Sequence, residues 1–176
     1  MILVAILGKS GSGKSTLEAA LEKVGYNRMI SYTTRDMREG EQNHREYHFI
    51  NREQFQKLVD NGVIIEYAEY NGNLYGSARP IGTSKNVIVV EPDGLHKLKE
   101  LYGNQVISIY MDIPDDEIER RLNIRGNTPD RKARKLADIK KFSGIKDNVD
   151  LVLYQSDTPN TAIIKITNFA IARGIV

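Results

Sequence analysis

Cysteine is absent from this chain of 176 residues, and its apolar runs are short. Without cysteine the chain has neither disulfide bonds nor thiolate-bound metals, which suits a reducing compartment. The apolar start, MILVAIL, is seven residues long with no basic region before it, so we expect neither a signal peptide nor a membrane span. A net charge of +2 is too small to indicate nucleic-acid binding. These absences predict a cytoplasmic enzyme or binding domain whose partners include neither a membrane nor a nucleic acid.

The composition that remains is ordinary for a globular domain, with 40% hydrophobic and 27% charged residues. Buried strands are expected at the short apolar segments 2–7, 86–90, 106–111 and 149–154. Apolar residues at helical spacing lie between and after them, at 17–24, 94–103, after Pro114 and after Thr158. Strands that are apolar on both faces and alternate with helices predict an α/β fold, with a parallel sheet covered by helices on both sides.

Two segments depart from this alternation. Residues 31–80 are polar, rich in tyrosine and hairpin-like, with a helix expected at 52–60 and a strand at 63–70. Residues 120–146 contain ten Lys and Arg but only two acidic residues. We interpret both as insertions into a single domain, whose core is then made of residues 1–30, 81–119 and 147–176.

The stretch GKSGSGKS, residues 8–15, matches G-x-x-x-x-G-K-[ST] and lies between a predicted strand and a predicted helix. Its glycines allow successive backbone N–H groups to turn toward phosphate oxygens, and the helix that follows directs its positive end at them. Lys14 can reach the terminal phosphates, and the Ser15 hydroxyl can bind Mg²⁺. The predicted ATP-binding residues are Gly8, Gly11, Ser12, Gly13, Lys14, Ser15 and Thr16.

The stretch SYTTRDMREG, residues 31–40, carries Arg35 and Arg38 three positions apart. A phosphoryl acceptor that is itself a phosphate ester is a dianion, and planar guanidinium groups hold its oxygens through paired hydrogen bonds. The hydroxyl of Tyr47 can add a further donor. The spacing of two arginines alone is more typical of a solvated surface, so this interpretation depends on what surrounds it.

Several separated motifs follow the phosphate loop in a characteristic order: S-x-T-T-R-x-x-R-x-G-E at 31–41, Tyr-x-Phe at 47–49, I-E-Y at 65–67 and G-N-x-Y-G-S at 72–77. In this order they resemble the guanylate kinase family. The resemblance implies a P-loop core, an inserted lobe at 31–80 that binds the nucleoside monophosphate, and a basic lid at 120–146. It also implies transfer of the γ-phosphoryl group of ATP to GMP, and to dGMP, with Mg²⁺.

Position by position, the resemblance assigns the acceptor phosphate to Arg35, Arg38, Tyr47 and Tyr75, and the guanine base to Ser31, Glu66 and Ser77. The chemistry agrees, because guanine offers N1–H and N2–H₂ side by side to a carboxylate and an O6 acceptor to a hydroxyl. In the lid, Arg121 and Arg125 match family arginines, and Arg134 or Lys135 matches another. The residues expected to act in catalysis are Lys14, Arg35, Arg125 and Arg134.

Two stretches differ from the family pattern. Where family members carry D-x-D-x-x-G, this chain has VVEPDG, so Glu91 replaces the second aspartate, with Asp93 as the competing assignment. Glu91 is therefore included among the GMP-binding residues. The spacing after Asn127, which precedes Arg134, also differs from the family's, and the segment between Ser77 and the strand at 86–90 is shorter than the family's.

Two other functions fit parts of the pattern. A kinase for another phosphorylated acceptor, such as a ribose bisphosphate, would need the phosphate loop but not Ser31 and Glu66. A non-catalytic guanylate-kinase-like binding module would not need the intact Lys14 and Ser15. No residue pattern specifies an oligomeric state.

Overall fold

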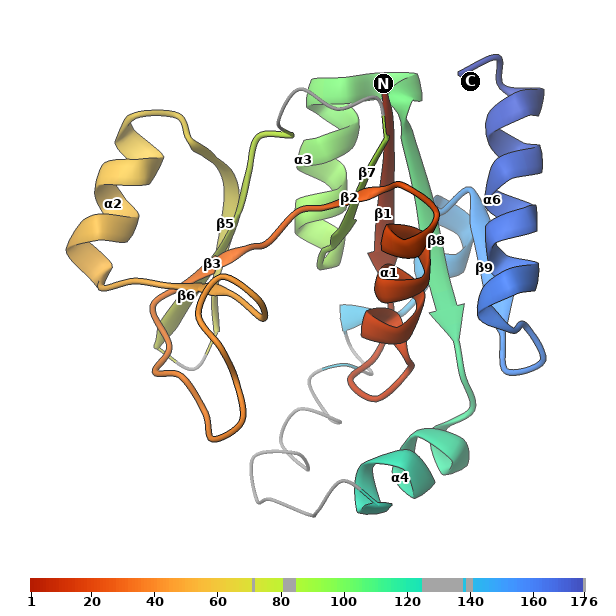
Figure 1. Ribbon diagram of the computed structural model, residues 1–176, viewed down its shortest axis with the longest axis horizontal. Coiled ribbons are helices and arrows are strands. Elements are labelled where there is room, and N and C mark those ends of the chain that lie inside the picture. The colour runs from red at the N-terminus through yellow and green to blue at the C-terminus, as the bar shows by residue number, and fades with distance from the viewer. Residues whose placement is uncertain (71, 81–84, 125–137, 139–140, 176) are drawn as a thin grey trace.

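The computed structural model describes every residue of the chain except 71, 81–84, 125–137, 139–140 and 176 (Figure 1). The predicted lid residues Arg125 and Arg134 therefore lie outside the described residues. In the part that is described, no helix is both long and apolar enough to cross a membrane.

A parallel sheet forms the centre of the molecule, as predicted. Among the described residues its five strands follow the order β2-β7-β1-β8-β9, and every neighbouring pair is parallel. They are β1 (Ile2–Leu7), β2 (Asn27–Arg28), β7 (Lys85–Val89), β8 (Val106–Asp112) and β9 (Leu151–Tyr154). The carboxyl ends of β1 and β8 point to the same side, the lower edge in Figure 1, where the site is built.

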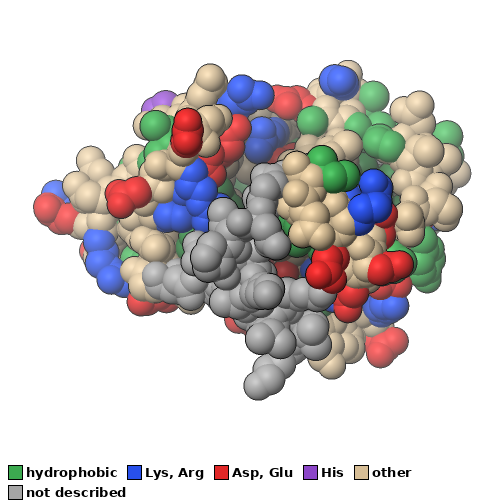
Figure 2. Space-filling view, turned by 90° about the horizontal axis from the view of Figure 1, so that it is seen from below, with side chains coloured by type: hydrophobic (Ala, Val, Ile, Leu, Met, Phe, Trp, Pro, Cys, Tyr) green, Lys and Arg blue, Asp and Glu red, His purple; other side chains and the backbone are tan. Residues whose placement is uncertain are grey.

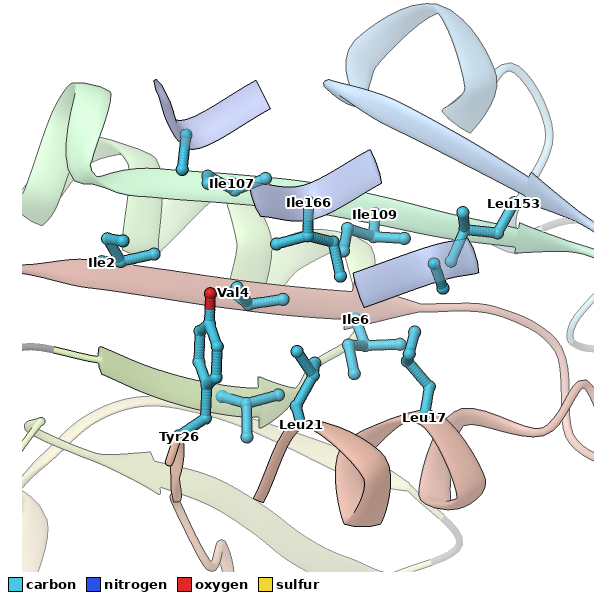
Figure 3. Close-up of a cluster of buried hydrophobic side chains, with 13 residues drawn as sticks. Ile2, Val4, Ile6, Leu17, Leu21, Tyr26, Ile107, Ile109, Leu153 and Ile166 are labelled. Carbon is cyan, nitrogen blue, oxygen red and sulfur yellow. The ribbon is translucent and has the colours of Figure 1, made fainter. Parts of the chain in front are cut away.

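Helices cover both faces of this sheet because β1 is apolar on both sides. Ile2, Val4 and Ile6 face one cluster, with Leu17 and Ile166 from the covering helices (Figure 3). Leu3, Ala5 and Leu7 face the other, which includes residues of α3. The helices are α1 (Lys14–Lys23) and α6 (Pro159–Ala172) on the first face, α3 (Pro92–Tyr102) on the second, and α4 (Asp115–Ile124) beyond the end of β8.

Helix α3 begins two residues before the predicted start at residue 94. Pro92 occupies the first turn and Glu91 the N-cap position. Proline is favoured there because its missing N–H has no partner in a first turn. The earlier start brings Gly94 into the helix. It also places Glu91 just after β7, at the edge of the sheet where the phosphate loop lies.

A second, smaller sheet lies within residues 31–80. Its strands are β3 (Tyr32–Thr33), β4 (His48–Phe49), β5 (Ile64–Tyr70) and β6 (Asn73–Ala78), in the order β4-β3-β6-β5. Helix α2 (Arg52–Asp60) covers one face, and its N-terminus is fixed by a capping box. The Asn51 side chain accepts a hydrogen bond from Gln54 N–H at 2.8 Å, and the Gln54 side chain accepts one from Asn51 N–H at 3.0 Å.

The face of the small sheet beneath α2 is apolar. Phe55 is fully buried there with Ile64 and Leu74. Gly76 of β6 makes this packing possible, because a Cβ at that position would lie 2.8 Å from Phe55 Cζ. The opposite face is turned toward the core of the molecule and carries polar side chains.

A β-bulge in β5 determines which side chains reach that polar face. Ile64 pairs with Ala78 but Glu66 pairs with Ser77, so one extra residue, Ile65, is inserted. Ile64 packs beneath α2, whereas Ile65 packs against the core cluster that includes α3. Because side chains alternate along a regular strand, Glu66 would otherwise point the same way as Ile64. The bulge instead directs Glu66 toward the core.

Candidate active site

The glycine loop between β1 and α1 has the backbone that its sequence predicts. Gly11 and Gly13 have φ angles of 86° and 99°, which glycine adopts without strain. The Ser10 N–H donates a hydrogen bond to Asp138 Oδ2 at 2.8 Å. The loop therefore already directs a backbone donor at an anionic oxygen, as phosphate binding requires.

Lys14 follows this loop at the start of α1 and folds back across it. Its Nζ donates to the carbonyl oxygens of Gly8 at 2.6 Å and Lys9 at 3.0 Å. Burial lowers the pKa of Lys14, and the charges of Glu91 and Asp138 act in the opposite direction. The ammonium group is thus placed at the mouth of the loop, with two carboxylates near it.

The remaining predicted ATP-binding residues differ in exposure. Ser12 is fully buried, whereas Ser15 and Thr16 are exposed in the first turn of α1. In the described part of the chain, no group of three or more His, Asp or Glu side chains converges on one point. An exposed hydroxyl beside the phosphate loop nevertheless fits Mg²⁺, because this ion takes few protein ligands and completes its coordination with substrate phosphates and water.

Helix α4 packs against the same loop. Arg121 Nη1 donates to the Ser12 carbonyl oxygen at 3.2 Å, and its Nε pairs with Glu117 at 2.6 Å. Lys9 and Asp115 form a second link at 2.7 Å. Hydrogen bonds from Arg120 and Arg121 lower the pKa of Glu117 to about 2. Arg121, one of the predicted lid arginines, therefore lies directly over the phosphate loop.

A cavity of about 660 Å³ opens at the carboxyl ends of β8 and β9. Asp112, Pro114, Tyr154, Gln155 and Ser156 line it. Parallel α/β sheets bind ligands at the carboxyl ends of their strands, so this cavity is positioned to receive the base of a nucleotide held by the loop.

The small sheet brings four predicted acceptor residues into one row. Glu66 pairs directly with Ser77. Tyr32 pairs with both Gly76 and His48, so the preceding residue, Ser31, falls opposite Ser77 on one side and Tyr47 on the other. The row is thus Tyr47, Ser31, Ser77 and Glu66, on the face turned toward the core.

The Glu66 carboxylate is held on two sides. Its Oε1 accepts a hydrogen bond from the Ser77 hydroxyl. Its Oε2 lies against α3, where a Cβ on Gly94 would be only 2.8 Å away. Burial raises the pKa of Glu66, and Glu91 and Asp93 raise it further, while the Ser77 hydroxyl lowers it. A ligand that offers two N–H donors would stabilise the charged carboxylate here.

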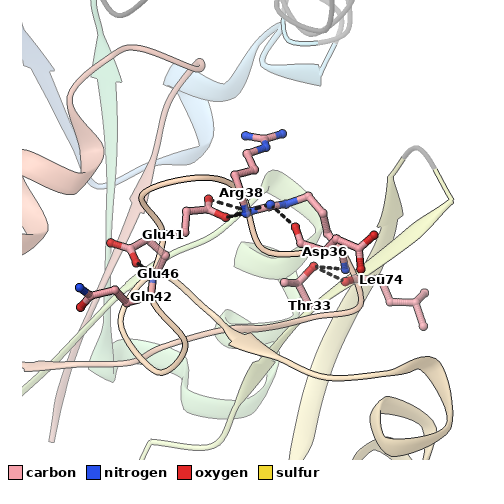
Figure 4. Close-up of polar contacts among 8 residues, drawn as sticks. Thr33, Asp36, Arg38, Glu41, Gln42, Glu46 and Leu74 are labelled. Carbon is pink, nitrogen blue, oxygen red and sulfur yellow. Dashed lines mark hydrogen bonds and ion pairs between the residues drawn. The ribbon is translucent and has the colours of Figure 1, made fainter.

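Arg35 is fixed from several directions. Its Nη1 and Nη2 donate to the two oxygens of Glu41 at 2.9 and 2.8 Å, and the guanidinium lies 5.7 Å from the centre of the Tyr47 ring and 5.4 Å from that of Phe49. Arg35 is only 12% exposed. Glu41 also accepts the Arg38 backbone N–H at 2.8 Å, whereas the Arg38 side chain points away from it (Figure 4).

The two predicted phosphate-binding tyrosines lie beside Arg35. The Tyr47 and Tyr75 rings meet edge to face, with centres 5.9 Å apart. Burial, and then Tyr75, raises the pKa of Tyr47, so its hydroxyl stays protonated and can donate a hydrogen bond. Arg35, Tyr47 and Tyr75 therefore lie together, whereas Arg38 is exposed.

Glu91 lies between the two halves of the site. Its charge raises the pKa of Lys14 in the loop and the pKa values of Tyr47 and Glu66 in the small sheet. Glu91 also forms an ion pair with Lys141 at 3.2 Å. Asp93 raises the pKa of Glu66 less than Glu91 does. This central position favours Glu91 over Asp93 as the replacement for the family aspartate. Figure 2 views this side of the molecule, where acidic and basic side chains are both exposed.

The sequence interpretation gave no role to three residues that shape the site. Glu41 holds Arg35, Gly94 leaves room for the Glu66 carboxylate, and Asp138 meets the phosphate loop. Glu41 was visible as the final residue of the motif at 31–41. The roles of Gly94 and Asp138 depend on tertiary contacts and have no local signal.

The protein has a parallel sheet, a glycine loop, a lysine at the start of the following helix and a row of polar side chains that faces the core. These features define a P-loop nucleotide-binding protein of the α/β class. The family model for guanylate kinases matches residues 1–169. The chain belongs to the guanylate kinase family.

Individual relatives agree with this assignment. A guanylate kinase of Malacoplasma penetrans is 32% identical over 172 residues, covering 91% of this chain and 88% of its own. One from Sus scrofa is 36% identical over 150 residues, covering 78% and 74%. The crystal structure of a guanylate kinase from Anaplasma phagocytophilum superimposes with a TM-score of 0.74 at 26% identity, covering 98% of this chain and 86% of that one. A sugar kinase from Janibacter, at 17% identity and a TM-score of 0.55, shares the fold alone.

Proposed function

We propose that this protein transfers the γ-phosphoryl group of ATP to GMP, and also to dGMP, giving ADP and the nucleoside diphosphate. The observation that carries the proposal is the row of Ser31, Ser77 and Glu66, which faces the core that holds the phosphate loop. A phosphate loop alone would fit many acceptors, but this row fits the hydrogen-bonding edge of guanine. The enzyme works in the cytoplasm, which the cysteine-free chain suits.

On the donor side, the loop backbone and Lys14 hold the ATP phosphates, and the cavity at the ends of β8 and β9 receives the adenine. Ser15 would hold Mg²⁺, and the ion would supply charge neutralisation for the phosphates when bound. Arg121, over the loop, neutralises charge on the transferring group. Arg125 and Arg134, outside the described residues, are proposed to add to it from the lid.

On the acceptor side, Arg35, Arg38, Tyr47 and Tyr75 hold the GMP phosphate in line with the donor. Glu66 accepts N1–H and N2–H₂ of guanine, Ser31 supplies a hydroxyl donor to the base, and Ser77 faces the base while its hydroxyl donates to Glu66. Glu91 contacts the guanine edge or water near the metal. In this scheme residues 31–80 form the acceptor lobe and 120–146 the lid; α4 begins before residue 120, so the lid would start within that helix.

ADP formation with different acceptors tests the proposal. With Mg-ATP present, we expect rapid ADP formation with GMP, slower formation with other monophosphates, and almost none with a ribose bisphosphate or with no acceptor. Rapid turnover of the ribose bisphosphate would instead favour the alternative kinase. No turnover with any acceptor, from a protein that still binds ATP and GMP in calorimetry, would favour the binding module.

Arg35→Lys should lower kcat/KM for GMP by about 10–100-fold, the scale of a lost hydrogen bond to a charged group. Lysine keeps the charge, but it cannot make the paired contacts that Arg35 makes with Glu41, nor stack on the Tyr47 ring. The measurement is steady-state kinetics with GMP, and with guanosine, which lacks the phosphate and should be a negligible acceptor.

Arg52→Lys is the matched control, because Arg52 forms an exposed ion pair with Glu69 on the outer side of the small sheet. Its kcat/KM should stay near that of the wild type. If Arg35→Lys and Arg38→Lys both retained wild-type kcat/KM, the phosphate-holding role of the two arginines would be wrong.

Gly94→Ala should raise KM for GMP about tenfold, because the new Cβ would stand 2.8 Å from Glu66 Oε2 and force the carboxylate to move. Overpacking of this kind costs about 1–3 kcal/mol. Alanine is the better helix former by about 0.5–1 kcal/mol, so a weaker α3 would not explain the loss. Kinetics with GMP and with ATP varied separately measure the effect.

Lys97→Ala, at an exposed position of the same helix, controls for changes in α3 itself. It should leave KM for both substrates unchanged. An equal rise of KM for ATP and GMP in Gly94→Ala would show that the substitution disturbs the whole site rather than Glu66.

A further inference from the structure

Two histidines meet at the edge of the small sheet, away from the row of acceptor residues. His44 Nδ1 and His48 Nδ1 are 2.6 Å apart, and the ring centres are separated by 4.9 Å. His48 belongs to β4 and its ring lies 4.5 Å from that of Tyr32. Because alternate residues of a strand face opposite sides, His48 is on the reverse of the face that carries Tyr47 and Phe49.

The backbone at His44 is held in an unusual conformation to bring this ring into place. Among the described residues it is the one non-glycine position with a positive φ, 66°. Such a conformation costs about 1–3 kcal/mol for most residues and persists only where the surroundings maintain it. Here the Asn43 side chain accepts the N–H groups of both His44 and Phe49 at 3.0 Å, which closes the loop between the two histidines.

Two neutral imidazoles whose Nδ1 atoms face each other can share only one proton between them. If that proton moves to the Nε2 atom of its own ring, both Nδ1 lone pairs converge on one point. Imidazole nitrogens lie about 2.0–2.1 Å from Zn²⁺, so two of them bound to one tetrahedral ion are about 3.3 Å apart. The observed separation of 2.6 Å is about 0.7 Å shorter, a gap that rotation of the two side chains would close.

Solvent reaches the pair from a neighbouring pocket. His44 borders a cavity of about 320 Å³, which gives water access to complete a coordination shell, and Glu22, Arg28 and Arg45 line the same cavity. Glu46 lies on the loop between the two histidines, where it accepts the Gln42 N–H at 2.6 Å (Figure 4) and pairs with Arg45 at 3.6 Å.

We propose that His44 and His48 form a two-histidine site for Zn²⁺ or a similar divalent transition-metal ion, with water as the remaining ligands. Nitrogen ligands of this kind select Zn²⁺, Ni²⁺ or Cu²⁺ over Mg²⁺, which prefers oxygen. The site is therefore distinct from the Mg²⁺ that accompanies ATP. Bound metal would join residues 44 and 48 across Tyr47, and so fix the loop that presents this tyrosine to the acceptor.

Calorimetric titration of the full chain with ZnCl₂, without nucleotide, tests the proposal. The wild type should bind one Zn²⁺, and His44→Asn and His48→Gln should each weaken binding by at least about tenfold, since even outer contacts of a metal site have effects of this size. Asparagine is chosen at position 44 because it tolerates positive φ. Loss of binding below pH 6 in the wild type should follow, because protonated imidazoles cannot bind metal.

His96→Gln is the matched control, because His96 is the third histidine of the chain and is exposed on α3. Its affinity for Zn²⁺ should equal that of the wild type. Failure of the wild type to bind Zn²⁺, unchanged binding in either pair variant, or an equal loss in His96→Gln would each overturn the proposal. The titration needs no catalysis, so its result is independent of the proposed function.

Discussion

Lys14→Met should lower kcat by roughly 10²–10³-fold, the scale for losing one preorganised electrostatic contact with a transition state. Lys14 lies at the mouth of the phosphate loop, with its Nζ held by the carbonyls of Gly8 and Lys9. Methionine has similar length but no charge, so the loop keeps its shape while the transferring phosphoryl group loses its partner. The measurement is steady-state turnover of GMP at saturating Mg-ATP.

The same variant should remain folded, which its melting temperature and circular dichroism spectrum would report. Burial lowers the pKa of Lys14, so the fold disfavours the charged ammonium and gains from a neutral side chain, offsetting the two lost hydrogen bonds. Lys23→Met, at an exposed position in the last turn of α1, should leave turnover unchanged. A folded Lys14→Met enzyme with near-normal turnover would contradict the assignment.

GMP and dGMP should exceed AMP, CMP and UMP in kcat/KM by about 10⁴-fold, the discrimination reached by sites that hydrogen-bond a polar group of the substrate. AMP places the N1 lone pair where Glu66 requires a donor and has no N2 amine. Glu66 is already partly buried between Ser77 and α3, so this mismatch would leave its carboxylate desolvated and facing an acceptor. IMP retains N1–H and O6 but lacks N2, and should fall between the two groups.

Glu66→Ala should reduce GMP turnover strongly, because Glu66 is in the row of acceptor residues. ATP binding should stay nearly unchanged, because the ATP phosphates are held by the phosphate loop and Lys14. Glu69→Ala is the matched control on the same strand, since Glu69 is exposed and pairs with Arg52. The measurement is kcat/KM for each monophosphate at saturating Mg-ATP. If AMP or a pyrimidine monophosphate matched GMP, the family would describe the fold but not the choice of base.

The parts of the fold that local sequence determines were predicted correctly. The parallel sheet follows from apolar segments such as 2–7, whose residues face a core on both sides. The phosphate loop follows from glycines that supply positive φ at positions 11 and 13. The helix at 52–60 was also predicted, and its cap at Asn51 is a local contact between residues three positions apart.

The family resemblance identified the acceptor residues, but the sequence could not predict how they are arranged in space. Placing Ser31, Ser77 and Glu66 in one row requires the register of three strands and the bulge at Ile65. The fork between Arg35 and Glu41 and the contact of Gly94 with Glu66 depend on tertiary packing. Arg125 and Arg134 remain predictions, because they lie outside the described residues.

The bulge at Ile65 reverses the alternation of side chains along β5, so this short strand contributes to both the apolar packing and the acceptor site. Before it, Ile64 belongs to the apolar packing under α2; after it, Glu66 serves the acceptor, while Tyr67 returns to Phe55 beneath the helix. Deleting one residue at the bulge would turn each following side chain to the opposite face, so that Glu66 would point under α2 and Tyr67 toward the nucleotide. In evolutionary terms, this strand can accept substitutions on either side far more readily than any change in its length.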